Sequence, residues 1–273
     1  MVSREQRRRQ LARAKQHRQE SRREPAARHG GRRRTAAVAV LLVAVLTAGT
    51  VALALAMTLD SGKGGEGAAS AAPEDPCAEP AAGEPSGERW DTEPDLDIDP
   101  SAGYSLLLET TCGDIEIALD AAAAPRTVNS FRFLAGHGYF DHTRCHRLVT
   151  GPVRVLQCGD PEGTGRGGPG YSLPDENLDD PSVADGVYPA GTVAMANRYD
   201  AATGTGRNSG GSQFFLVYED SPLPPDFTPF GTVTGGAEVL ERISEAGSYP
   251  DPATGNTAPH ATVVIDRATV SGG

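Results

Sequence analysis

The chain has 273 residues and a formal net charge of −11. That charge is distributed very unevenly: residues 1–34 contain thirteen basic and three acidic residues, whereas the rest contains twelve basic and thirty-three acidic ones. The asymmetry excludes a single globule of uniform composition and predicts segments of different physical character.

The N-terminal basic segment, residues 1–34, has two interpretations. A run of arginines can bind nucleic acid through its phosphates, but the segment that follows favours a role in membrane topology. Residues 35–59 are twenty-five residues without a charge, and as a helix they exceed the roughly 30 Å hydrocarbon core of a bilayer. The basic flank then predicts a cytoplasmic N-terminus. We therefore expect no nucleic-acid partner, a single-pass transmembrane signal-anchor over 35–59 in the lipid bilayer, and an extracytoplasmic remainder at the cell membrane.

The apolar run also permits cleavage. Ala54, Leu55 and Ala56 resemble the small-residue site of a signal peptide that is removed from the mature chain. The run is longer than the apolar core of about 7 to 15 residues usual in such peptides, which favours an uncleaved anchor. Cleavage after Ala56 stays open as the alternative.

Residues 60–100 are predicted to be a disordered acidic linker. The segment contains six prolines, twelve acidic residues, many glycines and alanines, and almost no large apolar side chains. Such a composition cannot bury enough apolar surface to offset the entropy lost on ordering. Trp90 is the one large aromatic residue, and it can either dock on the folded domain or remain solvated.

Four cysteines lie beyond the predicted membrane segment, namely Cys77, Cys112, Cys145 and Cys158. On an oxidising side of the membrane their disulfides can persist. Four cysteines allow three pairings, and the spacing chooses none of them. Because no two follow a C-x-x-C pattern, we interpret them as structural cysteines or free thiols rather than a metal or redox site.

Residues 101–273 are predicted to form the folded domain. Apolar residues alternate over 104–108 and 115–119 around a turn at 111–113, which is typical of a β-hairpin. Pro125 begins a helix, because its missing N–H costs nothing at the first position, and Gly136 or Gly138 ends it. A second helix is expected over 237–246, and further strands over 145–149, 153–157, 192–196, 213–217, 230–233 and 262–265. Many short strands and two helices predict a mainly β fold, a closed antiparallel barrel.

Two patterns hint at other chemistry. The glycine-rich run 163–168 could bind phosphate, but it lacks the Lys-Ser/Thr ending of a P-loop and is interpreted as a solvent loop. His142 and His146 lie four residues apart, which suits a metal pair on a helix, whereas the local pattern here is a strand. We expect no metal site.

Five motifs occur together in the second half of the chain. They are Cys145-His146-Arg147-Leu148, Leu156-Gln157-Cys158-Gly159-Asp160, Met195-Ala196-Asn197, Gly211-Ser212-Gln213-Phe214-Phe215 and Phe230-Gly231-Thr232-Val233. Their order and approximate spacing resemble the cyclophilin family, and the likeness extends over about 103–270.

The resemblance implies a cyclophilin-like, closed eight-stranded antiparallel β-barrel capped by two helices, with a groove for proline-containing polypeptides. It implies peptidyl-prolyl cis-trans isomerase activity without a cofactor, and we expect the protein to be a monomer. With the extracytoplasmic location predicted above, this activity is expected to assist the folding of exported proteins. Carried over residue by residue, Arg147 is the catalytic arginine, and the substrate-binding residues are Gln157, Met195, Ala196, Asn197, Gln213, Phe215, Leu223 and Phe227. The alternative is a non-catalytic proline-binding or chaperone module on the same fold.

The chain also departs from the family pattern around the expected groove. Two extra residues separate Arg147 from Gln157, and Arg154 stands where an aromatic residue is expected. The stretch 198–209 is longer than usual, and Pro222 and Phe227 replace the usual tryptophan and histidine. These changes predict altered preference for residues flanking proline and weak inhibition by cyclosporin.

Overall fold

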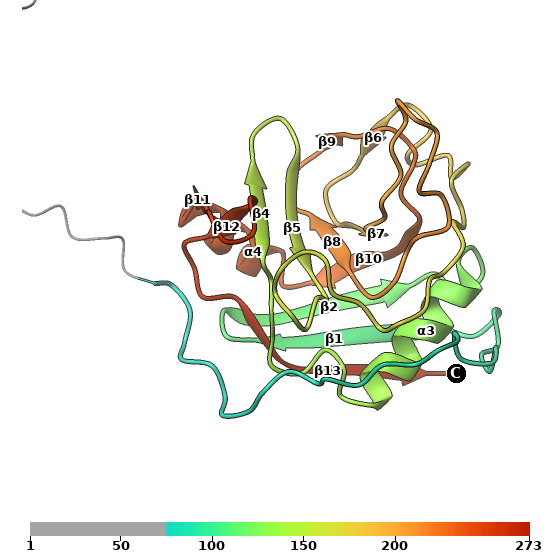
Figure 1. Ribbon diagram of the computed structural model, residues 1–273, viewed down its shortest axis with the longest axis horizontal. Helices are drawn as coiled ribbons and strands as arrows, with labels where there is room; N and C mark the ends of the chain where they lie inside the picture. The colour runs from blue at the N-terminus through green and yellow to red at the C-terminus, as the bar shows by residue number, and fades with distance from the viewer. Residues whose placement is uncertain (1–74) are drawn as a thin grey trace, which may run out of the picture. The chain divides into compact units, whose positions relative to one another are not determined.

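The computed structural model describes residues 75–273 (Figure 1). The predicted basic segment, the predicted transmembrane segment and residues 60–74 of the predicted linker lie outside the described residues. None of the helices found within residues 75–273 has the length and apolar character needed to cross a membrane. These helices are α3 (Pro125–Gly136) and α4 (Ala237–Glu245).

The described part of the chain is otherwise built from short strands. They are β1 (Tyr104–Thr110), β2 (Gly113–Leu119), β3 (Thr143–Arg144), β4 (Arg147–Thr150), β5 (Arg154–Cys158), β6 (Val187–Tyr188), β7 (Thr192–Met195), β8 (Phe214–Val217), β9 (Ser221–Pro222), β10 (Pro229–Gly235), β11 (Ser248–Pro250), β12 (Thr257–Pro259) and β13 (Val264–Gly272). Nine of them form one antiparallel sheet in the order β3-β13-β1-β2-β10-β7-β8-β5-β4, while β11 pairs with β12 and β6 with β9.

The large sheet curls round so that its two edge strands, β3 and β4, are consecutive in the chain. Only Cys145 and His146 separate them. The expected mainly β, antiparallel architecture with two helices is confirmed. The expected closed eight-stranded barrel is met in part, because the sheet has nine strands and β3 and β4 lie at its two ends.

The first elements form where the local patterns predict them. In the β1–β2 hairpin Leu108 lies opposite Ile115, and both side chains are buried while their neighbours alternate outward. Such period-two alternation places one face of each strand in the core. Helix α3 begins at Pro125 and ends at Gly136, as expected.

All six strands predicted after α3 are found with bounds that differ from the predicted ones, five of them by only one or two residues, and two of the shifts have a clear cause. The strand expected over 145–149 begins at Arg147, because Cys145 and His146 lie between the β3 and β4 ladders. The strand expected over 262–265 begins at Val264 and continues to Gly272, since β13 pairs along β1 from one end to the other. Long-range pairing rather than local apolar content sets both boundaries.

The main core lies on the inner face of the sheet. Phe131 of α3 has its ring centroid 5.1 Å from that of Phe140, 5.4 Å from that of Phe214 and 4.6 Å from that of Phe230. All four side chains are fully buried. Helix α3 is therefore fastened to strands β8 and β10 through one aromatic group, as expected for rings at these spacings.

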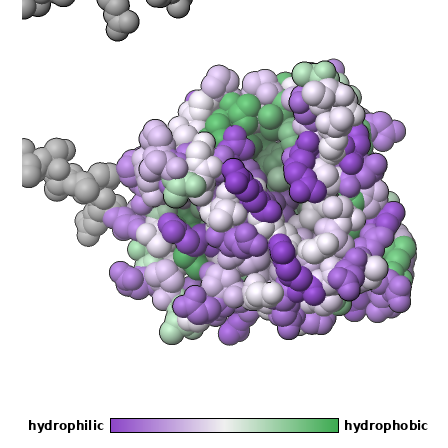
Figure 2. Space-filling model, in the orientation of Figure 1, coloured by the Kyte–Doolittle hydropathy of each residue, from purple (hydrophilic) through white to green (hydrophobic). Residues whose placement is uncertain are grey.

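A second apolar group lies on the outer face of β5, β7 and β8. We call it the outer cluster; it consists of Val155, Val183, Tyr188, Ala194, Phe215 and Val217, with Leu223 and Phe227 packed against it and partly exposed. In Figure 2 an apolar hollow opens near the top of the molecule, in the area of β5, β6, β8 and β9, and hydrophilic residues border it. An apolar hollow with a polar rim is a typical binding surface.

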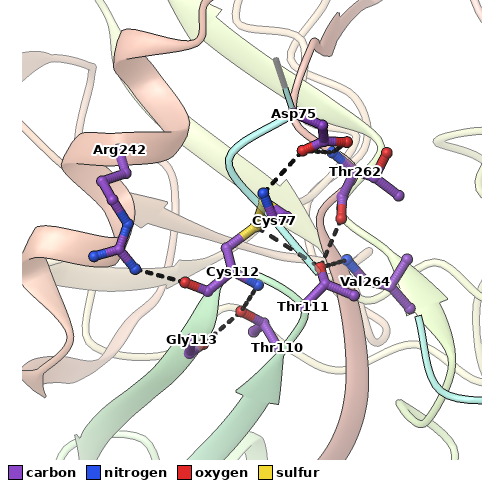
Figure 3. Close-up of a disulfide and its surroundings, with 9 residues drawn as sticks. All are labelled: Asp75, Cys77, Thr110, Thr111, Cys112, Gly113, Arg242, Thr262 and Val264. Atoms are coloured by element: carbon purple, nitrogen blue, oxygen red, sulfur yellow. Dashed lines mark hydrogen bonds between the residues drawn. A yellow bond between two sulfur atoms is a disulfide. The ribbon is translucent and has the colours of Figure 1, made fainter. Parts of the chain in front are cut away.

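Residues 75–100 lie along the domain as an extended strap. Cys77 forms a disulfide with Cys112 in the β1–β2 turn, and the N–H of Ala78 donates to the carbonyl of Thr111 at 2.8 Å. The Asp75 carboxylate accepts from the N–H of Thr262 at 2.9 Å. Figure 3 shows the disulfide and the contact between Asp75 and Thr262. The N-terminal end of the strap is thus attached both covalently and through hydrogen bonds.

Trp90 fastens the middle of the strap. Its ring centroid lies 5.1 Å from that of Phe133 and 5.8 Å from that of Tyr139, and its backbone N–H donates to the carbonyl of Pro169 at 2.8 Å. Gly170 has φ +102°, and a Cβ there would lie 2.5 Å from the carbonyl oxygen of Trp90, so this close backbone contact requires glycine.

The structure therefore differs from the prediction of a disordered linker over residues 75–100. The composition correctly indicates that this segment has no core of its own, but a disulfide and one indole packed against α3 and partly buried supply contacts with another part of the chain. Trp90 docks on the domain, which was one of the two alternatives.

Candidate active site

Arg147 and Gln157 face each other across the β4–β5 ladder. They are register partners, and the guanidinium of Arg147 donates to the Oε1 of Gln157 at 3.2 Å. The amide of Gln157 donates to Gln213 at 2.8 Å, and the amide of Gln213 donates to the carbonyl of Gly167 at 2.9 Å. This chain of three hydrogen bonds ties Arg147 to the glycine-rich loop and restricts its orientation.

Arg147 carries a charge that nothing nearby neutralises. Its side chain is half-buried, and burial lowers the pKa of the guanidinium from its ordinary value of 12.5 without making it deprotonate in the neutral range. Within residues 75–273, no carboxylate lies at salt-bridge distance from it. Its outward N–H groups are therefore free to bind a substrate atom.

The neighbour of Arg147 is a buried histidine. Both ring nitrogens of His146 lack a hydrogen-bond partner in the described part of the chain. Burial lowers the pKa of His146, the charge of Arg147 lowers it further and the carboxylate of Asp160 opposes both effects. A neutral imidazole here adds no second positive charge beside Arg147.

The outer cluster lies directly beside this polar pair. Gln157 is the register partner of Phe215, whose own partner on the other side is Ala194. Phe227 stands nearly perpendicular to Phe215, with ring centroids 5.4 Å apart. A cation with free donors thus adjoins an apolar surface built from aromatic side chains.

Tyr188 holds Phe227 in place. Its hydroxyl donates to the carbonyl of Phe227 at 2.7 Å and accepts from the N–H of the same residue at 3.2 Å. Burial raises the pKa of Tyr188 to about 12, so the hydroxyl remains a donor. The wall formed by Phe227 is consequently fixed through its backbone.

Met195 is the one predicted pocket residue that the structure places elsewhere. It pairs with Phe214 in the ladder and belongs to the main core on the inner face of the sheet, whereas Ala194 shares the outer face with Phe215. Strand parity explains the difference, since adjacent residues of β7 point to opposite faces.

Val155 belongs to the outer cluster but was not predicted as a site residue from the sequence. It is buried in the outer cluster and stands two residues before Gln157 on β5. The period-two relation to Gln157 is the signal that would have found it. Arg154, by contrast, turns away: its guanidinium donates to the carbonyl of Gly151 and to Glu219, each at 2.7 Å. Pro222 is exposed on β9.

The other wall of the site follows β7. The N–H of Ala196 donates to the carbonyl of Gln213 at 2.9 Å, and the side-chain amide of Asn197 donates to the carbonyl of Asp226 at 2.7 Å. Arg207 forms salt bridges with Asp175 and Asp226, so it joins the long 198–209 segment to the loop that carries Phe227. The lengthened segment is therefore an ordered part of the site.

The glycine-rich run 163–168 does not present its amides to solvent. The fully buried carboxylate of Asp160 accepts backbone N–H groups from five residues, Glu162, Thr164, Gly165, Arg166 and Gly167. These are the donors that a phosphate would need. An internal carboxylate occupies them, and the run is a wall of the site.

The second disulfide braces the same place. Cys145, two residues before Arg147, is bonded to Cys158, the residue after Gln157. Of the three possible pairings the structure has Cys145 with Cys158 and Cys77 with Cys112. Residues 75–273 contain no free cysteine.

Comparisons with known proteins point to one family. The family described as cyclophilin type peptidyl-prolyl cis-trans isomerase/CLD matches residues 105–270. The chain is 44% identical over 172 residues to the probable peptidyl-prolyl cis-trans isomerase B of Mycobacterium leprae (strain TN), covering 60% of this chain and 55% of the relative. It is 43% identical over 171 residues to the protein of the same description in Mycobacterium tuberculosis (strain H37Rv), covering 59% and 53%.

A shorter relative is covered almost completely. The peptidyl-prolyl cis-trans isomerase B of Bacillus subtilis (strain 168) is 40% identical over 143 residues, which are 52% of this chain and 90% of that protein. A solved cyclophilin type isomerase of Cryptosporidium parvum aligns with a TM-score of 0.49 at 25% identity, covering 62% of this chain and 98% of that one. The chain spans about half the length of the mycobacterial relatives. Because the family match extends over more than half of its length, the chain belongs to the cyclophilin-type peptidyl-prolyl cis-trans isomerase family.

Proposed function

We propose that residues 101–273 catalyse the cis-trans isomerisation of X-Pro peptide bonds in polypeptides. The observation that carries this proposal is the half-buried, unpaired Arg147 held by Gln157 beside the outer cluster. The resemblance to isomerases over 105–270 supports it.

The chemistry needs only what this arrangement offers. Rotation about an X-Pro bond breaks amide resonance against a barrier of about 18–20 kcal/mol and requires no nucleophile, metal or proton relay. As the bond twists, the proline nitrogen becomes pyramidal and gains a lone pair that can accept a hydrogen bond. A fixed guanidinium donor at that point stabilises the twisted state more than the planar one, which is the condition for catalysis.

Each part of the site has a role in this proposal. Phe215, Leu223 and Phe227 hold the pyrrolidine ring, with Val155 of the same outer cluster beneath them. Gln157 and Gln213 orient the guanidinium of Arg147 through their hydrogen bonds. Just after β7, the carbonyl of Ala196 and the backbone of Asn197 bind an extended substrate, while the Ala196 N–H stays bonded to Gln213.

The test is an isomerisation assay with the full-length purified chain. Exchange between cis and trans forms of a proline peptide is followed by NMR, which needs no coupling protease. We expect faster exchange on addition of the protein. Binding of the peptide without any change in exchange rate would instead establish the alternative, a proline-binding or chaperone module.

We further propose that the domain acts outside the cytoplasm on exported proteins, held by a membrane anchor at 35–59. The support is the uncharged run with its basic flank and the two disulfides, which are typical of oxidising compartments. Protease added to intact cells should release a soluble fragment that begins before Asp75, because the strap is bound to the domain. Full protection of the chain in intact cells, with cleavage only after lysis, would contradict this orientation.

A further inference from the structure

A pocket of ≈570 Å³ adjoins the site next to Gln157 and Gln213. Its walls come from the strap, the glycine-rich loop, the end of β7 and the segment before β8. Gln157 and Gln213 belong to its lining, so it begins where the hydrogen-bond chain from Arg147 ends.

Three arginines line this pocket and no acidic residue does. They are Arg89 from the strap, Arg166 from the glycine-rich loop and Arg198 after β7. Residues 75–273 contain thirty acidic residues, eleven arginines and no lysine. A pocket that gathers three of eleven arginines and none of thirty acids in so acidic a domain has a charge opposite to its surroundings.

The positive charge of the pocket is only weakly compensated. Arg166 and Arg198 form no salt bridge within the described residues. Arg89 approaches Glu162 at 3.4 Å, but their side chains are 61% and 54% exposed, and such solvated pairs are weak.

One further carboxylate lies behind the pocket wall. Asp160 is fully buried, and its carboxylate accepts from the backbone N–H of Glu162 and from those of four residues in the glycine-rich loop. A Cβ on Gly167 would lie 2.0 Å from the Oδ1 of Asp160, which shows how tightly the loop encloses this group. Its charge is thus directed to the loop amides rather than to the pocket.

We propose that this pocket binds an acidic side chain of the substrate polypeptide close to the proline, and that Arg89, Arg166 and Arg198 determine this specificity. The inference rests on the isomerase function proposed above. Since an extended chain advances about 3.3 Å per residue, a side chain within three residues of the proline reaches from the outer cluster past Gln157 into the pocket. Arg89 lies outside the family-matched residues 105–270, so the strap contributes to substrate choice.

The experiment compares matched peptides with Glu, Gln or Lys placed in turn at each position from three before to three after the proline. The kcat/KM of the full-length protein is measured for each peptide. At one position Glu should exceed Gln by about three- to tenfold, the scale of two or three partly exposed ion pairs, and Lys should be poorest. The preference should shrink at high salt, which screens exposed charges.

Variants assign the preference to the pocket. In the triple variant R89Q, R166Q and R198Q the Glu-to-Gln ratio should fall toward one, and each single variant should lower it in part. R267Q is the matched control, because it removes an arginine that is 69% exposed on β13, outside the pocket, and its ratio should match the unmodified protein.

The outcomes separate the two proposals. Absence of isomerisation with every peptide overturns the proposed function. Isomerisation with equal kcat/KM for Glu and Gln at all positions overturns this inference alone. A Glu preference that survives in the triple variant overturns the assignment to the three arginines.

Discussion

The two disulfides of this domain fasten different parts of it. Cys77–Cys112 closes a sequence separation of 35 and attaches the strap to the β1–β2 turn, with Cys77 outside the family-matched residues. Cys145–Cys158 closes a separation of only 13 and encloses Arg147 and Gln157 between its ends. The first holds an added segment on the domain, and the second braces the candidate catalytic pair.

The length of the loop that each disulfide closes and its distance from the site therefore rank the two disulfides in opposite order. By chain entropy the longer loop should stabilise the fold by about 4 kcal/mol and the shorter by about 3 kcal/mol. By location only the shorter one should affect catalysis strongly. The comparison teaches that the stability a cross-link supplies and the function it supports are independent quantities.

The largest expected effect tests whether the braced region is catalytic. Arg147→Ala should lower kcat/KM by roughly 10² to 10³, the scale of losing one preorganised donor to a transition state. Arg147→Lys should recover part of this, because a point charge replaces a planar donor pair. Thermal unfolding of both variants, measured beside the activity, should stay near that of the unmodified protein. A folded Arg147→Ala protein with full activity would sink the mechanism.

Removal of the strap disulfide should affect stability most. Cys77→Ala with Cys112→Ala is expected to cost about 4 kcal/mol in the free energy of unfolding, measured by denaturant titration. Activity toward a peptide without acidic residues should remain close to normal, since neither cysteine contacts the site. A tenfold or larger fall in the kcat/KM of this variant, measured where it is fully folded, would show that the strap supports the catalytic pair directly.

The matched change at the other disulfide should reverse this pattern. Cys145→Ala with Cys158→Ala is expected to cost about 3 kcal/mol in unfolding free energy. It should also lower kcat/KM by about tenfold, because looser positioning of Arg147 and Gln157 costs rate. The comparison between the two disulfides fails if this variant keeps full activity at a temperature where it is fully folded.

The smallest effect is a pH dependence that belongs to the braced region. Burial lowers the pKa of His146 below its ordinary value of 6.5, so below that pH the unfolded chain takes up a proton that the native imidazole resists. Stability should fall as the pH drops from about 6.5, by at most about 1.4 kcal/mol per pH unit, until the native imidazole is also protonated. Asp160 opposes and Arg147 reinforces this shift.

His146→Leu isolates that contribution. Unfolding free energies of the variant and the unmodified protein are compared between pH 7 and pH 5, and the variant should show the shallower slope. Identical slopes would mean that His146 takes up its proton equally in the native and unfolded states.

Short-range patterns determined the local elements and the identity of the central residues. Alternating apolar residues predicted the β1–β2 hairpin, and Pro125 predicted the start of α3, because neighbours in the chain set backbone preference and facing. The resemblance of the motifs to the cyclophilin family made Arg147, Gln157, Gln213 and Phe215 the site candidates, and the structure places them side by side.

Only the tertiary structure decided the features that join distant segments. Trp90 packs against Phe133, and Cys77 is bonded to Cys112. The outer cluster contains Val155 and not Met195. The arginine-lined pocket takes its charges from Arg89, Arg166 and Arg198. Apart from the period-two relation of Val155 to Gln157, none of these features leaves a periodic signal in the sequence. They depend on how the curled sheet brings remote strands and the strap together, which is a property of the whole folded chain and not of any one of its segments.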